Sequence, residues 1–187
     1  MIIGITGTIG AGKGTIVEYL VSEKNFLHFS VRDFLCEVIE QRGLPINRDT
    51  MVEVANDLRA KHSPSYITDQ LLERAVKSGK NGVIESIRAV GEIDSLRKNK
   101  DFVLFAVDAD VQKRYERISK RKSATDNIDF ETFVSNEKRE MTTADPTKQN
   151  LSECIKKADY VFTNDKDIID LQRDVERVLN CQLTIKK

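Results

Sequence analysis

The stretch that decides the fold is GITGTIGAGKGT, residues 4–15, in which glycines and one lysine follow an apolar run. Its spacing, Gly7-x-x-x-x-Gly12-Lys13, is that of a phosphate-binding loop. The β-branched run at residues 2–5 predicts a strand before the loop, and apolar residues at helical spacing predict a helix after it. Backbone N–H groups of such a loop turn inward around phosphate oxygens, and the helix dipole adds positive charge there. The sequence therefore predicts an anion site close to the N-terminus.

Composition limits the size of the protein and its partners. The 187 residues, 40% hydrophobic and 32% charged, suffice for one buried α/β core and are short for two domains. We expect a single domain over residues 1–187. Thirty Lys and Arg residues balance thirty Asp and Glu residues, so no global field attracts nucleic acid or an anionic membrane. Any anion site must be local.

The cysteines and the first residues of the chain indicate in which cellular compartment the protein is expected. Cys36, Cys154 and Cys181 lie far apart and form no CxxC or CxxH pattern, which argues against a disulfide framework and a zinc site. The start MIIGITG lacks the basic region and the long apolar stretch of a signal peptide, and no later window approaches a membrane span. We expect a cytoplasmic protein without membrane or nucleic-acid partners, and the oligomeric state stays open.

Alternating strand and helix patterns predict the fold class. Short apolar runs predict strands at residues 2–5, 26–30, 82–86, 102–109 and 159–164. Helical spacing predicts helices at residues 13–24, 31–41, 48–61, 65–78, around 93–96, 111–122, 130–140 and 168–178. The alternation predicts a three-layer α/β/α fold with a five-stranded parallel sheet, whose strands end along one edge.

Polar residues follow two of these strands. Asp108 and Asp110 end the fourth strand, and we expect them to cap the next helix; assistance to Mg²⁺ is the alternative. After the fifth strand, residues 164–167 read Asn-Asp-Lys-Asp, the wrong order for the guanine-reading Asn-Lys-x-Asp of GTPases. A GTPase switch is therefore not expected.

The ending of the loop departs from the simplest pattern, because Gly14 stands where Ser or Thr is common and the hydroxyl comes at Thr15. The form GxxGAGKGT resembles adenylate kinase and its nucleoside monophosphate kinase relatives. This resemblance implies a P-loop kinase that uses ATP and Mg²⁺, with Lys13 as a catalytic residue at the β- and γ-phosphates and Thr15 as a metal ligand. It implies a donor-binding loop that comprises Gly7, Gly10, Ala11, Gly12, Lys13, Gly14 and Thr15.

The acceptor is expected on a helical insertion at about residues 30–78. HFSVRDFLCEVI, residues 28–39, resembles the monophosphate-kinase element in which a strand ends in Ser-x-x-Asp and a helix begins. Ser30 is expected to cap this helix while Arg32 and Asp33 face the acceptor; simple capping and a solvated arginine are the alternatives. An archaeal P-loop family related to dephospho-CoA kinase implies, by analogy, a further acceptor contact from one helical arginine, Arg59.

VIESIRAVGEIDSLR, residues 83–97, resembles the DGFPR region of adenylate kinases and the DGIR loop of the same archaeal family. Glu85 takes the acidic position, which implies contact with the Mg²⁺ hydration shell, and Arg88 takes the position that grips an acceptor phosphate and serves catalysis. Glutamate is one methylene longer than aspartate, and Ser86 replaces glycine. A plain surface carboxylate is the alternative for Glu85.

A lid is expected at about residues 121–147. Arg114, Arg117 and Arg121 recur at roughly one-turn spacing, so one helix would point them toward the transferring phosphoryl group. Arg121 matches the arginine that opens the lid in monophosphate kinases, and Arg117 is a second catalytic candidate. A solvated basic helix face is the alternative.

QNLSECIKKADYVFTND, residues 149–165, resembles the ending of dephospho-CoA kinases, where a loop after a strand passes the adenine. The resemblance implies that Asn164 and the backbone near Asp165 read the base. True dephospho-CoA kinases carry Asp-Ala-Asp after the second strand, where this chain reads SVRDF, residues 30–34.

Together these features predict a phosphotransferase that moves the γ-phosphate of ATP to a small nucleotide-like acceptor, first of all a nucleoside or deoxynucleoside monophosphate. Two alternatives stay open. One is a dephospho-CoA kinase, which would phosphorylate a ribose 3′-hydroxyl. The other is a regulatory module that binds ATP and transfers nothing, against which the arginines on both sides of the predicted site argue.

Overall fold

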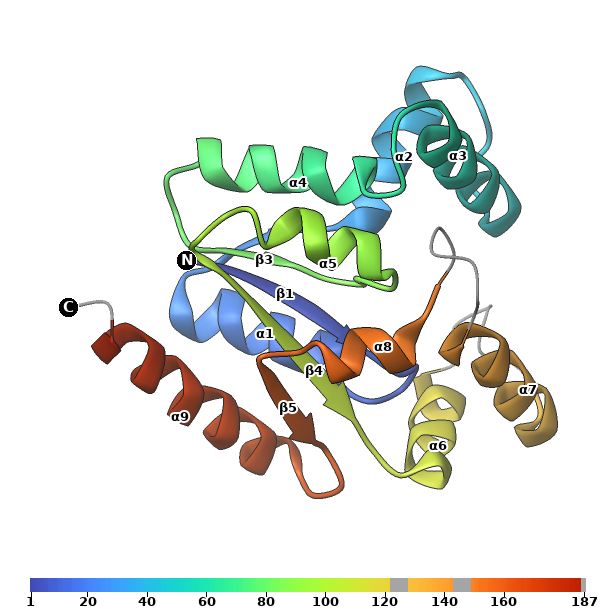
Figure 1. The fold of residues 1–187 in the computed structure, drawn as a ribbon. Coiled ribbons are helices and arrows are strands. Elements are labelled where there is room, and N and C mark those ends of the chain that lie inside the picture. The colour runs from blue at the N-terminus through green and yellow to red at the C-terminus, as the bar shows by residue number, and fades with distance from the viewer. Residues whose placement is uncertain (122–127, 143–148, 186–187) are drawn as a thin grey trace.

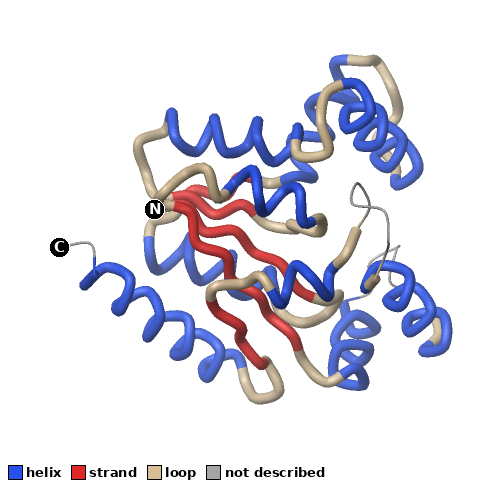
Figure 2. The backbone as a smooth tube through the Cα atoms, in the orientation of Figure 1, coloured by secondary structure: helices blue, strands red, loops and turns tan. Residues whose placement is uncertain are grey.

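A single five-stranded sheet forms the centre of the protein. The computed structural model describes residues 1–121, 128–142 and 149–185. All strand pairs are parallel, in the order β2-β3-β1-β4-β5. Helices cover both faces of the sheet (Figures 1 and 2), which confirms the predicted α/β fold. The strands are β1 (Ile2–Gly7), β2 (Leu27–Phe29), β3 (Gly82–Ile84), β4 (Phe102–Asp108) and β5 (Tyr160–Thr163).

The helices lie close to the predicted positions. Within the described residues they are α1 (Lys13–Lys24), α2 (Val31–Gln41), α3 (Arg48–Lys61), α4 (Tyr66–Lys77), α5 (Val90–Leu96), α6 (Val111–Arg121), α7 (Phe130–Met141), α8 (Leu151–Lys156) and α9 (Ile168–Ile185). None of these described helices combines the length and the apolar character needed to span a membrane.

Two apolar clusters hold the three layers together. Successive residues of β1 point to opposite faces of the sheet, so Ile2 joins one cluster while Ile3 and Ile5 join the other. The first cluster packs the sheet against α2 to α5 and α8, and the second packs it against α1 and α9. Burial on both faces explains why the central strands are nearly continuous apolar runs.

Local sequence signals set the start of the acceptor-side helices. The Ser30 hydroxyl accepts a hydrogen bond from the Asp33 N–H at 3.2 Å and caps α2, as predicted. The Asn47 side chain caps α3 in the same way, with the Thr50 N–H at 2.9 Å. These caps fix the residues at which the two helices begin.

The carboxyl ends of the strands lie between two groups of helices, α2 and α3 on one side and α6 and α7 on the other (Figure 1). Of the predicted lid at 121–147, residues 122–127 and 143–147 lie outside the described residues. Helix α7 packs on α6 through aromatic rings, with the Tyr115 centroid 5.2 Å from Phe130 and 5.7 Å from Phe133.

Candidate active site

A cleft of about 1320 Å³ opens at the carboxyl edge of the sheet. Its walls come from the glycine-rich loop, from α2 and the start of α3, from the loop after β3, from α6 and α7, and from the segment after β5. Pockets for one small ligand are typically about 300–1,000 Å³. The cleft is therefore large enough for two substrates side by side.

The glycine-rich loop takes a backbone shape that favours glycine. Gly7, Gly10 and Gly12 have φ angles of +137°, +77° and +110°, values that side chains rarely tolerate. Gly12 is the N-cap of α1, so Lys13 is the first residue of the helix. The motif thus places a positive helix end at the cleft.

Side chains outside the loop hold its carbonyl groups. An Arg114 Nη1–H donates to Ile9 O at 3.3 Å, and Asn164 Nδ2–H donates to Ala11 O at 2.8 Å. In a trans peptide the next N–H points opposite to the carbonyl, so the amides of Gly10 and Gly12 point away from these tethers. Both glycines line the cleft. The tethers thereby orient loop amides toward a ligand.

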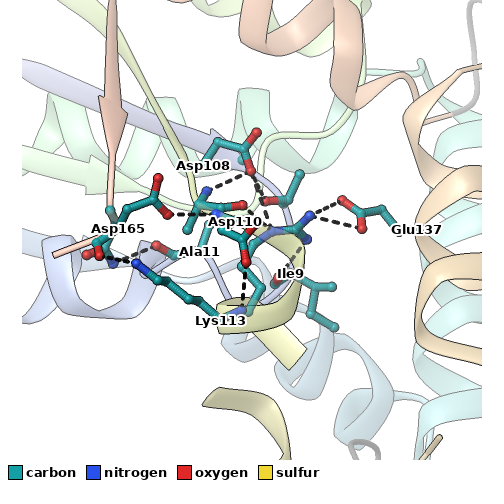
Figure 3. Close-up of polar contacts among 12 residues, drawn as sticks. Ile9, Ala11, Asp108, Asp110, Lys113, Glu137 and Asp165 are labelled. Carbon is teal, nitrogen blue, oxygen red and sulfur yellow. Dashed lines mark hydrogen bonds and ion pairs between the residues drawn. The ribbon is translucent and has the colours of Figure 1, made fainter. Parts of the chain in front are cut away.

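Arg114 corrects one prediction. It was expected to face the transferring phosphoryl, but its side chain is only 6% exposed and lies beneath the loop. It donates to Ala109 O at 2.7 Å and pairs with Glu137 of α7 at 2.8 Å (Figure 3). Arg114 lies one turn before the buried Ile118, and this face of α6 turns inward. Arg114 supports the loop and ties α6 to α7.

Asn164, which the resemblance assigns to the base, lines the cleft and is largely buried. Its amide nitrogen donates to the loop carbonyl of Ala11 at 2.8 Å. Its backbone N–H donates to Asp108 O at 2.8 Å. Asn164 therefore also holds the glycine-rich loop against the end of the sheet.

Asp108, the last residue of β4, and Asp110, two residues later, have different roles. Asp110 Oδ1 accepts from the N–H groups of Gln112 and Lys113 at the start of α6, as predicted for a cap (Figure 3). Asp108 instead accepts from the Thr8 hydroxyl at 2.6 Å and from its neighbour, the Ala109 N–H, at 2.9 Å. Asp108 is thus a third tether of the loop.

Lys13 is the charged centre of the cleft. Its Nζ donates to Gly7 O and Thr8 O, both at 2.8 Å. Burial, followed by the positive charge of Arg88, lowers the pKa of Lys13 to about 8; Glu85 and Glu140 act in the opposite direction. Arg121 lowers the pKa of Lys13 as well. Charged residues from the loop after β3, from α6 and from α7 therefore share the cleft lining with this lysine.

The acidic strand end carries an unexpected partner. Glu85 lines the cleft, and its Oε1 lies 3.2 Å from Nε2 of His28 on the adjacent strand β2. The hydrogen bond with His28 lowers the pKa of Glu85, and the same contact raises the pKa of His28. Ser86, which replaces the glycine of the resembling motif, has a left-handed φ of +64°. The turn keeps the glycine geometry without the glycine.

The side chain of Arg88 lines the cleft, and hydrogen bonds hold its backbone in place. Its N–H donates to the buried carboxylate of Glu92 at 2.9 Å, and its carbonyl accepts from the Asn150 N–H at 2.8 Å. Its guanidinium pairs with Glu140 of α7 at 2.9 Å. Burial raises the pKa of Glu92. The structure directs Arg59 to this carboxylate, 3.6 Å away, instead of to the cleft.

The remaining predicted residues divide between the cleft and its surroundings. Arg32, Arg117 and Arg121 line the cleft, and an Arg117 Nη2–H donates to Asn164 O at 2.8 Å. Ser30 and Asp33 lie outside the lining, at the start of α2. The loop residues that line the cleft are Ile9, Gly10, Gly12, Lys13, Gly14 and Thr15, whereas Gly7 and Ala11 are outside the lining.

Two oxygen-bearing side chains suit a hard cation. Thr15 offers a hydroxyl and Glu85 a carboxylate, and both line the cleft beside Lys13. Magnesium is usually held by one or two such protein oxygens together with substrate phosphates. In the parts of the chain that the structure describes, no group of three or more His, Cys, Asp or Glu residues gathers as a metal site. The residues present fit a cation that arrives with a phosphate ligand.

Sequence reasoning missed four carboxylate and imidazole groups at this site: His28, Glu92, Glu137 and Glu140. Only Glu92 had a local signal, since a glutamate three residues into a helix often reaches back to the N-cap N–H. It does so here, with Ala89 N–H at 3.1 Å. The others meet partners that are distant in sequence, which no local pattern displays.

The chain matches a known family model and known proteins over most of its length. A family model described as AAA domain matches residues 3–145. A UPF0200 protein of Methanococcus vannielii is 30% identical over 169 residues, which cover 89% of this chain and 88% of that protein. A UPF0200 protein of Methanocaldococcus jannaschii is 29% identical over 182 residues, covering 96% and 89%.

Solved structures share the fold. A crystal structure of a Thermus thermophilus protein aligns with a TM-score of 0.65 at 20% identity and covers 96% of both chains. A shikimate kinase from Bacteroides thetaiotaomicron aligns with a TM-score of 0.60 at 15% identity, covering 96% of this chain and 98% of that one. At these identities the likeness establishes a P-loop kinase-like fold.

Proposed function

Because the chain belongs to the AAA domain family and to the UPF0200 proteins, with a P-loop kinase-like fold, we propose that it transfers the γ-phosphate of ATP to a small phosphate-bearing, nucleotide-like acceptor. The observation that carries the proposal is that Lys13 shares the lining of one cleft with Arg88 from the loop after β3 and Arg121 from α6. A protein that only binds ATP needs no cations on two sides of the phosphate loop. A protein that transfers a phosphoryl group between two anionic substrates needs cations on both sides.

The donor would lie along the glycine-rich loop. Lys13 and the loop amides would hold its phosphates, and the N-terminus of α1 would add positive charge. Ile168 and Ile169, which line the cleft and are 59% and 64% exposed, offer an apolar surface to the base. Thr15 and Glu85 would bind or orient Mg²⁺, which when bound neutralises phosphate charge.

The acceptor would lie between α2 and the loop after β3. Arg88 would grip its phosphate, and Arg32 offers a second cation from α2. Arg117 and Arg121 would neutralise charge on the transferring group from the opposite wall. Transfer to a phosphate oxygen needs alignment and charge neutralisation more than a base. We propose that α7 covers these groups and excludes water.

An ADP-release assay tests the proposal. ATP and Mg²⁺ are supplied with ribonucleoside and deoxynucleoside monophosphates, and separately with dephospho-CoA, and Lys13→Ala is the control. We expect turnover with at least one monophosphate, and a severe loss of this turnover in the control. Turnover with dephospho-CoA alone would mean that the accepting group is a ribose hydroxyl and not a phosphate. Tight ATP binding without turnover on any acceptor would favour a regulatory module and count against the proposal.

The depressed pKa of Lys13 predicts pH-dependent ATP binding. Only protonated lysine attracts phosphate, and the free protein loses this proton as the pH rises through about 8. The affinity for ATP should therefore fall about tenfold between about pH 7 and pH 9, measured by titration calorimetry. Lys13→Arg keeps its proton throughout, so its affinity should not decline. A flat profile in the unmodified protein would contradict the assignment.

A further inference from the structure

The guanidinium of Arg88 already holds an oxyanion. Its Nη1 lies 2.9 Å from the Glu140 carboxylate, in the last turn of α7, and donates to Gln149 Oε1 at 3.3 Å. Arg88 and Glu140 both line the cleft. A carboxylate of the protein therefore sits at the guanidinium that faces the acceptor side.

The backbone and the side chain of Arg88 are held differently. Its peptide groups are fixed on both sides, by the buried Glu92 carboxylate and by the Asn150 N–H. The side chain pair with Glu140 is open, with exposed fractions of 36% and 33%. The neighbouring pair of α7, Arg114 with Glu137, is 6% and 12% exposed. Water can replace the first pair at little cost, whereas the second is part of the interior.

Glu140 also acts on the phosphate-binding lysine. Its negative charge opposes the lowering of the Lys13 pKa, and Glu140, Lys13 and Arg88 all line the same cleft. A substrate phosphate between donor loop and acceptor site would need these same two cations. Glu140 cannot keep its position beside them without repelling that phosphate.

We propose that Glu140 is a built-in competitor for the acceptor's anionic group: it occupies Arg88 in the free protein, and an acceptor phosphate displaces it. The inference rests on the proposed function, because it concerns the same cleft, and it adds a regulatory contact. Displacement frees the last turn of α7 from the loop after β3, while the buried Arg114–Glu137 pair keeps the helix attached. Acceptor binding is thereby coupled to the position of α7.

Inorganic phosphate serves as the probe of the Arg88 position. The donor loop is first filled with a non-hydrolysable ATP analogue and Mg²⁺, and phosphate is then titrated by calorimetry. In Glu140→Gln we expect phosphate to bind roughly two- to fivefold more tightly than in the unmodified protein, as expected for loss of a half-exposed ion pair. Arg88→Met should weaken phosphate binding at least about tenfold, with or without Glu140→Gln.

A matched control separates competition from a general charge effect. Glu73→Gln removes the same charge from an exposed pair with Lys77 on α4 and should leave phosphate affinity unchanged. Unchanged phosphate binding in Glu140→Gln would overturn the inference, because Glu140 would then not compete for Arg88. Weaker binding would overturn it too, because Glu140 would then support Arg88. The analogue is a separate readout: if it fails to bind, the proposed function fails, whereas normal analogue binding with unaltered phosphate affinity refutes only the role of Glu140.

Discussion

Replacing Lys13 by alanine should lower kcat/KM for ATP-dependent transfer by about a thousandfold. Removal of one preorganised charge aimed at developing negative charge typically costs about 10²–10³ in rate. Lys13 is the point on which Arg88, Arg121, Glu85 and Glu140 act together. Its loss removes the cation at the junction of donor and acceptor, so weakened binding adds to the loss in rate. Steady-state kinetics with the acceptor found in the screen measures both.

The fold should survive this change. Burial and neighbouring positive charge already disfavour the charged form of Lys13, so the free protein pays for holding it there. The carbonyls of Gly7 and Thr8, which Lys13 leaves behind, border an open cleft where water can reach them. The thermal midpoint of Lys13→Ala should therefore stay at or above that of the unmodified protein.

Lys24→Ala is the matched control for Lys13→Ala. It makes the same substitution at the opposite end of α1, where Lys24 pairs with Glu176 of α9 at 2.5 Å. We expect full activity, because Lys24 lies outside the cleft lining. A Lys13→Ala variant that keeps more than about a tenth of the activity would place the catalytic cation elsewhere in the cleft.

The glycine-rich loop and the element order could be predicted because their signals are local. The spacing of Gly7, Gly12 and Lys13 lies within one strand, turn and helix, and α3 begins and ends at the predicted residues. The Ser30 cap is a contact over three residues, and it too was predicted correctly. Contacts between residues that are close in sequence determine these features, so the sequence alone suffices to predict them.

The positions that could not be predicted depend on contacts distant in sequence. Arg114, Arg117 and Arg121 follow one another on α6 at nearly equal spacing, and only contact with Ile9 and Glu137 turns the first of them inward. Asn164 meets Ala11 across 153 positions of the chain. The same spacing of residues is compatible with several rotations of a helix about its axis. Only the packed structure therefore shows which of the three arginines faces inward.

The same reasoning applies to the pair of Glu85 and His28. Strands β2 and β3 are parallel and place Phe29 beside Ile84, so the residues around them face each other at the sheet edge. The sequence shows a strand-end carboxylate, but the pairing of strands brings an imidazole to it. Several residues that line the cleft were thus predictable from the sequence, whereas the partners that orient them were not.

Gly7→Ala and Gly14→Ala should have opposite effects on stability, although both change a glycine of the same loop. Gly7 has φ +137°, and a Cβ there would overlap Val107 O of the neighbouring strand β4. Both the overlapping carbonyl and the backbone of β1 are fixed by strand pairing, so neither moves aside easily. Combined strain and overpacking predict a loss of about 4 kcal/mol in the free energy of unfolding.

Gly14 has no such constraint. It lies in the first turn of α1, and a Cβ there would meet nothing within 4 Å. Alanine in a helix is favoured over glycine by up to about 1 kcal/mol, so Gly14→Ala should leave the free energy of unfolding unchanged or raise it. Gly14 lines the cleft, so the added methyl group takes space that we assign to the donor phosphates.

Urea unfolding of the two variants should separate them by several kcal/mol, and ATP titration should show weakened binding in the stable Gly14→Ala protein. Equal stabilities would mean that the loop relaxes around a side chain at Gly7, while unweakened binding in Gly14→Ala would mean that the open space beside Gly14 is not where phosphate binds.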